Sequence, residues 1–590
     1  MLHAGLRQPG EGKGLAAAGR RHELTSSARC GYGGSGTYDD HEAAPMAWPW
    51  TPEIPLLNDK PVFQVTATAA ENAGQGCDLH AALKARPETR PDNGRWRRRY
   101  SDDTFTLGPL VDAIAQVHGV TARGTDLGEA VGRARMAFGS LHPGWRTFLE
   151  LALEQYFEYH EAREQELGAL RYLGLTNKVA LRPGSAVMTW GPLYENESGM
   201  REIRRLRFGR AHSEHTVWAD VAAYVAAELA TDRPVRQVYV TEVGLQDGVE
   251  RHLINGIAPE QAREGYERSV RPKARSVVEG AVRTPGHDCE SCKFTGGCPD
   301  LVAVPGMLQL DAPAAWSRSV SAHDLSLHRR CPSRWYLQRQ LNLPREAEDS
   351  DTLRRGTAAH AWIDQAHRRG TACELGDLPA PGAEGAGSDG LGSGGLGSGG
   401  LSEEEYRLAY PFLLRHVDVC PFREGPVDVV LAERSVHARD PEADVVVVAK
   451  PDLLIRRDGA LVVRELKTSG GHLPADEREA RDRYLAVVFD LALLAYGLAE
   501  RYDCAEGKVE LEILTPNEAA VFTYSTEDPL MAKVSREQLK AHAEEWAHDT
   551  TWDTRPGPQC AWCPVREWCP DRDAYGATVA GPPPTEDAPF

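Results

Sequence analysis

Two acidic residues and one lysine in the second half of the chain have the types and spacing that phosphodiester chemistry requires. The segment VVVVAKPDLLIRRDGALVVRELKTS, residues 445–469, predicts two β-rich runs joined by an Asp-Gly pair, a strong hairpin signal. Asp452 lies on the first run, and Glu465 and Lys467 lie two residues apart on the second. Because side chains alternate along a strand, Glu465 and Lys467 share one face, and Asp452 can approach them across the hairpin.

Two carboxylates and a lysine on one sheet face are suited to metal-assisted hydrolysis of a phosphodiester. The oxygens of Asp452 and Glu465 are hard ligands for Mg²⁺ or Mn²⁺, which polarises the phosphate and activates the attacking water. Lys467 would orient that water or offset charge in the transition state. The competing interpretation is an exposed ion pair, since solvated Glu-x-Lys pairs are common. The apolar residues around Glu465 indicate a half-buried strand with its charges on one face.

Asp452 followed by Glu465-Leu466-Lys467 resembles the core of the PD-(D/E)XK nuclease superfamily, and in particular RecB-like and AddB-like exonuclease domains with a four-cysteine iron–sulfur cluster. The stretch SVSAHDLSLHRRCPSRWYLQRQLNL resembles the opening helix of such domains, and RRGTAAHAWID resembles their Gly-Thr-x-x-His helix. The resemblance covers residues 319–570. It implies that His360 is a further metal ligand, that DNA is the substrate, and that the fold is α/β with a restriction-endonuclease-like core, a mixed central sheet flanked by helices.

One position departs from the pattern of that family. The helix after the lysine strand usually carries Gln-x-x-x-Tyr, but the matching run DLALLAYGL has Asp490 at the Gln position and Leu494 at the Tyr position. The two family residues help to bind or orient nucleic acid. Their replacement therefore puts the efficiency or the substrate choice in doubt more than the binding of metal.

The cysteines of the second half form one distant residue and one C-x2-C-x5-C group. Four thiolates can hold a [4Fe–4S] cluster or a Zn²⁺ ion. The family resemblance favours the iron–sulfur cluster, which would tie the two ends of the domain together. The four candidate ligands are Cys331, Cys560, Cys563 and Cys569. The remaining cysteines of this half, Cys373, Cys420 and Cys504, are interpreted as isolated thiols.

The first half repeats this organisation, which predicts a duplicated fold with a degenerate N-terminal copy. Residues 289–299 read CESCKFTGGCP and residues 560–570 read CAWCPVREWCP. Each follows a glutamate, Glu202 or Glu465, and the same expected order of hairpin, helix, strand and helix. A possible second metal site would use Cys77, Cys289, Cys292 and Cys298. Cys30, His287 and Asp288 are alternatives to Cys77 as the fourth ligand.

The first half lacks the catalytic set. Arg204 replaces the lysine, and Thr189 stands thirteen residues before Glu202, where an aspartate is expected. A single carboxylate holds catalytic metals poorly. The first half would then serve as a scaffold or bind DNA. The basic residues Arg204, Arg205, Arg207 and Arg210 would contact phosphate or form a solvated strand edge.

Composition limits the alternatives. With 590 residues, 41% hydrophobic residues and a net charge of −19, the chain is neither collagen-like nor wholly disordered. The longest apolar run, residues 484–499, is too short for a membrane span and predicts a core helix, and we expect a cytoplasmic protein without a membrane partner. The acidic balance disfavours nucleic-acid binding through net charge but allows a local basic groove.

The expected segments are a disordered N-terminus (1–60), the degenerate half (61–305), the nuclease domain (316–575) with a flexible insertion (380–401), and a disordered tail (576–590).

These observations favour a metal-dependent deoxyribonuclease, more specifically an exonuclease that acts on single-stranded or end-containing DNA in repair, recombination or defence. The sequence contains no G-x-x-x-x-G-K-[ST] loop, so unwinding would require a separate helicase or another repair or defence protein. The first alternative is a catalytically inactive, nuclease-like scaffold that binds nucleic acid. The second is a zinc-stabilised interaction protein.

Overall fold

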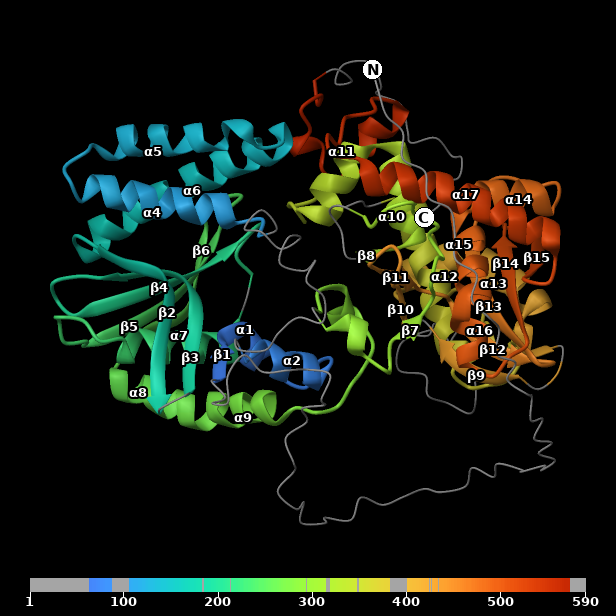
Figure 1. Ribbon diagram of the computed structural model, residues 1–590, viewed down its shortest axis with the longest axis horizontal. Helices are drawn as coiled ribbons and strands as arrows, with labels where there is room; N and C mark the ends of the chain where they lie inside the picture. Colours follow the sequence, from blue (N-terminus) through green and yellow to red (C-terminus); the bar gives the residue numbers. More distant parts are fainter. Residues whose placement is uncertain are drawn as a thin grey trace, which may run out of the picture. The chain divides into compact units, whose positions relative to one another are not determined.

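Figure 1 shows the computed structural model of the chain. All residues that the structure describes lie in one compact unit, Trp48–Phe590. Residues 1–60 and 576–590, most of the expected insertion at 380–401, and Cys30 are outside the described part. The described ranges are 63–86, 105–182, 185–212, 214–292, 294–314, 319–346, 350–382, 400–423, 425, 427–432 and 434–573.

The first half builds a six-stranded mixed sheet in the order β1-β3-β4-β5-β6, with β2 paired to β3. Its strands are β1 (Phe63–Thr66), β2 (Arg171–Arg182), β3 (Ser185–Glu195), β4 (Met200–Arg207), β5 (Gln237–Gly244) and β6 (Glu250–Ile257). Its helices are α1 (Ala67–Glu71), α2 (Asp78–Lys84), α4 (Gly108–Thr121), α5 (Leu127–Arg135), α6 (Pro143–Leu167), α7 (Val217–Glu228), α8 (Pro259–Gly265) and α9 (Arg271–Glu279). One apolar core joins the sheet to α4, α5 and α6 and another joins it to α7, α8 and α9, so helices cover both faces (Figure 1).

The second half contains a five-stranded sheet in the order β15-β14-β13-β12-β9 and a four-stranded sheet in the order β7-β10-β11-β8. The strands are β7 (Val302–Ala303), β8 (Ser319–Val320), β9 (Asp428–Ala432), β10 (Val436–Asp440), β11 (Val445–Ala449), β12 (Leu453–Arg457), β13 (Ala460–Thr468), β14 (Glu506–Leu514) and β15 (Ala519–Ser525). The helices are α10 (Ala322–Arg330), α11 (Pro332–Trp335), α12 (Asp351–His367), α13 (Glu403–Val419), α14 (Glu477–Arg483), α15 (Leu485–Leu493), α16 (Ala499–Arg501) and α17 (Pro529–His548).

These sheets confirm the expected α/β class with mixed sheets flanked by helices. The apolar run at 484–499 is confirmed as a core segment, since α15 is almost entirely buried. No helix within the described ranges is both long and apolar enough to cross a membrane.

The two halves share one order of connections. In the first half β3 and β4 are antiparallel, β4 and β5 are parallel and joined through α7, and β5 and β6 are antiparallel. In the second half β12, β13, β14 and β15 repeat this pattern, with α15 in the crossover. A duplication predicts this correspondence, and the domain boundaries given above stay predictions.

The hairpin that carries Glu465 and Lys467 turns at the Asp-Gly pair expected from the sequence. Arg457 pairs with Ala460, and the two residues of the turn, Asp458 and Gly459, have φ angles of 53° and 82°. Positive φ at both central positions matches a type I′ turn, which follows the twist of antiparallel strands and suits the Asp-Gly pair.

The run at 445–457 is not one strand, contrary to the sequence interpretation. Strand β11 belongs to the four-stranded sheet and β12 to the five-stranded sheet, with Pro451 between them. Proline lacks the N–H that a ladder needs, so the chain leaves one sheet and enters the other at this point. Asp452 therefore lies at the break immediately before β12, and not within a strand.

The equivalent position in the first half holds a buried ionic network. Glu202 on β4 has no exposed surface and accepts hydrogen bonds from Arg204 (2.9 Å), Arg163 (3.2 Å), Tyr159 (3.1 Å) and Thr241 (2.8 Å). Burial alone would raise the pKa of Glu202, but the charges of Arg204 and Arg163 lower it below its ordinary value. The carboxylate is therefore neutralised by side chains of the chain itself.

The residue opposite Glu202 is Tyr194 and not Thr189. Counting thirteen residues back from Glu202 fails because Glu202 lies two residues after the first residue of β4, whereas Glu465 lies five residues after the first residue of β13. The aromatic ring of Tyr194 lies 4.2 Å from the guanidinium carbon of Arg204, a cation–π contact. An aromatic ring thus stands where the second half has Asp452.

The predicted phosphate contacts of the β4 arginines are wrong for Arg204. Its side chain is fully buried, and β4 is an interior strand between β3 and β5, so the alternative of a solvated strand edge is also wrong. Arg205 pairs with Glu71 at 3.0 Å and Arg207 pairs with Glu242 at 2.6 Å. Arg210, which follows β4, is 81% exposed and lies 3.6 Å from Asp247.

Replacing Glu202 by Gln should destabilise the protein by about 3 kcal/mol or more, because it leaves two buried arginines without their shared counter-charge. The measurement is the free energy of unfolding from denaturant titration. A matched control is Glu129→Gln, which breaks an exposed pair with Arg133 on α5 and should cost no more than about 1 kcal/mol. Equal losses in the two variants would contradict the role assigned to the network.

Candidate active site

Asp452, Glu465 and Lys467 converge at the open end of the β12–β13 hairpin. Leu453 pairs with Arg464, so the next step along the register sets Asp452 beside Glu465. One carboxylate oxygen of Asp452 accepts a 2.6 Å hydrogen bond from the backbone N–H of Leu466. The Lys467 Nζ atom lies 3.3 Å from Glu465 Oε2. The hairpin therefore positions the three side chains through backbone geometry that the sequence encodes locally.

A helix from a distant part of the chain completes this group. Ser350 precedes helix α12, its side chain accepts a hydrogen bond from the N–H of Leu353, and the helix places His360 beside the hairpin. The Nδ1 atom of His360 lies 2.8 Å from Asp452 Oδ1. The structure thus brings together all four residues of the predicted site, while their roles stay predictions.

Asp490 stands where the family usually has a glutamine, and it adds a third carboxyl group to the site. It lies on α15, is 3% exposed and forms a hydrogen bond with Glu465. Leu494, at the position of the family tyrosine, is 1% exposed and packs in the main apolar core. Compared with the family pattern, the site therefore has the carboxyl group of Asp490 in place of an amide, and Leu494 in place of an aromatic ring.

The carboxyl groups differ sharply in proton affinity. Burial raises the pKa of Glu465 to about 7, with Asp452 adding to the rise and Lys467 opposing it. Burial would also raise the pKa of Asp452, but the charge and hydrogen bond of His360, together with Lys467, lower it to about 2. Burial and the charge of Glu465 raise the pKa of Asp490 well above its ordinary value. Crowded acidic groups with raised pKa values are characteristic of functional sites.

The donor set fits a divalent cation of the Mg²⁺ or Mn²⁺ class. Carboxylate oxygens are the ligands that these ions prefer, and an imidazole is acceptable to Mn²⁺. Asp452, Glu465 and His360 would hold the ion, and Asp490 supplies a further oxygen next to Glu465. A cation would also offset the burial and the repulsion between neighbouring carboxylates that raise the pKa values of Glu465 and Asp490.

A large groove opens beside these residues. Its volume is about 1040 Å³, and Glu465, Lys467 and Asp490 form part of its wall. Arginine and lysine side chains outnumber the acidic ones around it, seven to four. The basic residues come from α10, the helical turn after α11, the residue after β11, strand β13 and α14. They are Arg329, Arg330, Arg339, Lys450, Lys467, Arg481 and Arg483. A local excess of positive charge on an acidic protein suits a polyanionic ligand.

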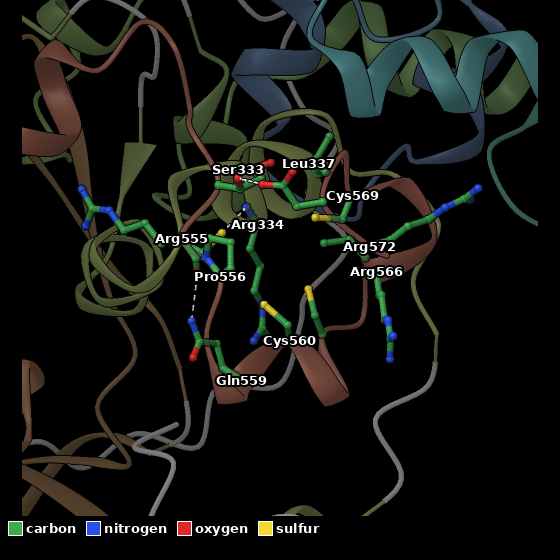
Figure 2. A pocket seen from close by; sticks show the side chains of 15 residues that line it. Ser333, Arg334, Leu337, Arg555, Pro556, Gln559, Cys560, Arg566, Cys569 and Arg572 are labelled. Carbon is green, nitrogen blue, oxygen red and sulfur yellow. Dashed lines mark hydrogen bonds between the residues drawn. The ribbon is translucent and has the colours of Figure 1, made fainter. Parts of the chain in front are cut away.

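The four cysteines of the predicted C-terminal cluster line one small cavity of about 30 Å³. In Figure 2 the sulfur atoms of Cys560 and Cys569 face the same space. Cys331 lies between α10 and α11, and its Sγ accepts a 3.4 Å hydrogen bond from the N–H of Arg334. Cys560 Sγ accepts a similar bond from Gly557. The fold thus brings the distant cysteine to the C-x2-C-x5-C group, while the bound species stays a prediction.

The first-half cysteines show a parallel arrangement. Burial raises the pKa of Cys289 to about 11, and the nearby thiols of Cys298 and Cys77 contribute to the rise. Cys289 Sγ accepts a 3.4 Å bond from the N–H of Gly286, which matches the bond from Gly557 to Cys560. Cys292 packs with Cys77 in a small apolar cluster. The four thiols lie near one another, and metal binding there stays a prediction.

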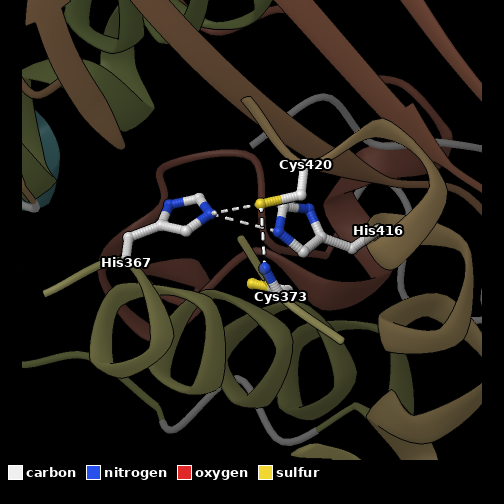
Figure 3. A group of neighbouring side chains, drawn as sticks. All are labelled: His367, Cys373, His416 and Cys420. Atoms are coloured by element: carbon white, nitrogen blue, oxygen red, sulfur yellow. Dashed lines mark hydrogen bonds between the residues drawn. The ribbon is translucent and has the colours of Figure 1, made fainter. Parts of the chain in front are cut away.

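The interpretation of Cys373 and Cys420 as isolated thiols is wrong. Figure 3 shows both residues beside His367 and His416, and one ligand atom from each of the four lies within 4.8 Å of the others. The signals that could have indicated this group are the spacings His-x5-Cys and His-x3-Cys. These spacings do not stand out in the sequence, because a Gly/Ser-rich stretch separates the two pairs and neither resembles a common zinc motif. Cys504 is not part of this group.

Comparisons with known proteins agree with this geometry. Residues 319–570 match the family model described as the PD-(D/E)XK nuclease superfamily. A search of curated proteins finds no match. Among solved structures, the crystal structure of SSO0001 is similar at 15% identity, with 43% of this chain and 87% of that chain covered and a TM-score of 0.22, a value too low to support an argument. The mixed sheets flanked by helices are consistent with a restriction-endonuclease-like fold. Residues 319–570, which carry Asp452, Glu465 and Lys467, therefore form a domain of the PD-(D/E)XK nuclease superfamily.

Proposed function

We propose that this domain hydrolyses phosphodiester bonds of DNA, acting as an exonuclease on single strands or on ends, in repair, recombination or defence. The superfamily implies nuclease activity that depends on divalent metal. The observation that carries the proposal is the position of Glu465, Asp490 and Lys467 on the wall of a groove with an excess of basic side chains. The preference for DNA ends and the biological setting rest on the likeness to RecB-like exonucleases.

Each residue of the site has a distinct task in this proposal. Asp452 and Glu465, with His360, would hold Mg²⁺ or Mn²⁺, which supplies Lewis-acid polarisation of the phosphate and activation of water. His360 and the Leu466 N–H fix the orientation of the Asp452 carboxylate. Lys467 stays protonated, because Glu465 and Asp452 raise its pKa despite burial, and it can offset the negative charge that develops on the phosphate.

The groove would receive the nucleic acid. Arginine and lysine side chains contact phosphate oxygens without regard to sequence, and the seven around the groove provide such contacts near the acidic cluster. The net charge of −19 repels DNA from the rest of the surface, so binding would concentrate at this groove. A helicase that exposes single strands would be a separate protein.

The C-terminal cysteines would bind a [4Fe–4S] cluster that joins α11 to the end of the domain. Four thiols from both ends of the domain line one cavity, which supports a shared inorganic group. Zn²⁺ is the alternative ligand. Anaerobically purified protein should contain iron that Cys563→Ser loses. Zinc in place of iron at these thiols would contradict the cluster.

A second candidate function is a catalytically inactive scaffold that binds nucleic acid. It is favoured by Asp490 and Leu494, which replace the two family residues that orient nucleic acid, and by the neutralised carboxylate Glu202 in the first half. The scaffold would bind DNA in the groove without metal-dependent cleavage.

Replacing Lys467 by Ala or Asp452 by Asn should lower the rate of DNA cleavage by about 100-fold or more while DNA binding persists. The measurement follows labelled single-stranded and duplex DNA with Mg²⁺ or Mn²⁺, and EDTA should abolish cleavage by the wild type. Product lengths would separate exonuclease from endonuclease activity. Cleavage that survives in Asp452→Asn would refute the assigned site, and binding without cleavage by the wild type would establish the scaffold.

Charge variants test the groove in the same assay. The double variant Arg329→Ala with Arg330→Ala, on α10, should weaken DNA binding and flatten its dependence on salt. The matched control removes two exposed arginines from α9 in the first half, Arg271→Ala with Arg275→Ala. Equal weakening by the two pairs would indicate an effect of net charge and would refute the groove.

A further inference from the structure

We propose that His367, Cys373, His416 and Cys420 bind one Zn²⁺ ion as a structural site separate from the catalytic carboxylates. The four ligand atoms lie within 4.8 Å of one another, although they come from two segments separated by the Gly/Ser-rich stretch (Figure 3). Two imidazole nitrogens and two thiol sulfurs form a donor set that selects zinc over magnesium or calcium.

The distances resemble those within a tetrahedral site. The Nε2 atoms of His367 and His416 lie 3.1 Å apart, and Cys420 Sγ lies 3.9 Å from His367 Nε2. Zinc bonds of about 2.0 Å to nitrogen and about 2.3 Å to sulfur place neighbouring ligand atoms about 3.3 to 3.8 Å apart. Small adjustments of the side chains would therefore enclose one ion.

The surroundings orient the ligands toward a common centre. His416 Nδ1 lies 2.6 Å from Glu512 Oε1, so this nitrogen carries the proton and Nε2 faces the group. Glu512 is itself held by Arg464 at 2.9 Å. A carboxylate behind a histidine is the usual support of a zinc ligand. The backbone N–H of Cys373 donates a 3.4 Å hydrogen bond to Cys420 Sγ, which favours the thiolate form.

The location also favours a cation. His367 is the last residue of α12, and Cys420 directly follows the end of α13. The C-terminal ends of both helices carry partial negative charge, which a bound cation offsets. The four ligands are at most 4% exposed, so no coordination position opens to substrate, and the site is closed in the manner of structural zinc.

A zinc ion here would join α12 to α13, which are far apart along the chain. The sequence between Cys373 and His416 includes a tandem LGSGG repeat. A metal bridge across such a segment removes conformational freedom from the unfolded chain. His360 lies two turns before His367 on α12. A bridge at His367 would therefore also help to hold His360 beside Asp452.

Metal analysis of the full-length protein tests the site. The double variant Cys373→Ser with Cys420→Ser should lose one zinc per chain relative to the wild type. The matched control is Cys504→Ser, which removes another buried cysteine and should keep the wild-type zinc content. The other cysteine clusters are intact in both variants, so the difference in zinc content between the two variants reports on this site alone. Equal zinc in the double variant and the control would overturn the proposal.

A second measurement uses the wild type and does not depend on the folding of a variant. Peptide-level mass spectrometry would follow alkylation of each cysteine by N-ethylmaleimide before and after removal of zinc with a chelator. Chelation should expose Cys373 and Cys420 to the reagent and leave the reactivity of Cys504 unchanged, and added zinc should restore protection. Reactivity of Cys373 and Cys420 that chelator and zinc do not alter would also overturn the proposal.

Discussion

The placement of two carboxylates side by side at a buried hairpin is the constraint on which the second half depends. Negative charges on neighbouring carboxylates repel each other, and burial removes the water that would screen them. The hairpin holds Asp452 and Glu465 together through strand register and the bond from the Leu466 N–H, with Lys467 and His360 as the nearest compensating groups. Burial, together with the charge of Asp452, raises the pKa of Glu465 to about 7 despite Lys467, so a further cation would stabilise the ionised carboxylate.

The first half meets the same constraint in another way. Its sheet has the same connections, and Glu202 takes the position of Glu465, but the compensating charge comes from buried arginines of the chain. Tyr194 stands in place of the second carboxylate, so no repulsion needs to be relieved. One framework thus produces a site that attracts a cation in one half and a closed, neutral core in the other.

The sequence predicts the parts of this arrangement that local rules determine. The Asp-Gly turn fixes the hairpin, and period-2 alternation places Glu465 and Lys467 on one face. The three cysteines of the C-x2-C-x5-C group are evident from their spacing, whereas Cys331 is added to them by the family resemblance and brought beside them by the fold. Other features depend on tertiary contacts that spacing does not encode. Asp490 joins the acidic cluster only because α15 crosses the hairpin, and Arg204 is buried because β4 is an interior strand. His367, Cys373, His416 and Cys420 meet only because the ends of α12 and α13 lie together.

The binding of Mn²⁺ by the protein, followed by calorimetry at pH 6 and pH 8, tests the central claim most directly. Because Glu465, with a pKa of about 7, must lose its proton to bind the ion, affinity should be weaker at pH 6. At that pH binding should release about one proton or more per ion, and Asp452→Asn should abolish it. Binding that is equally tight at both pH values without proton release, or that survives in Asp452→Asn, would contradict the account.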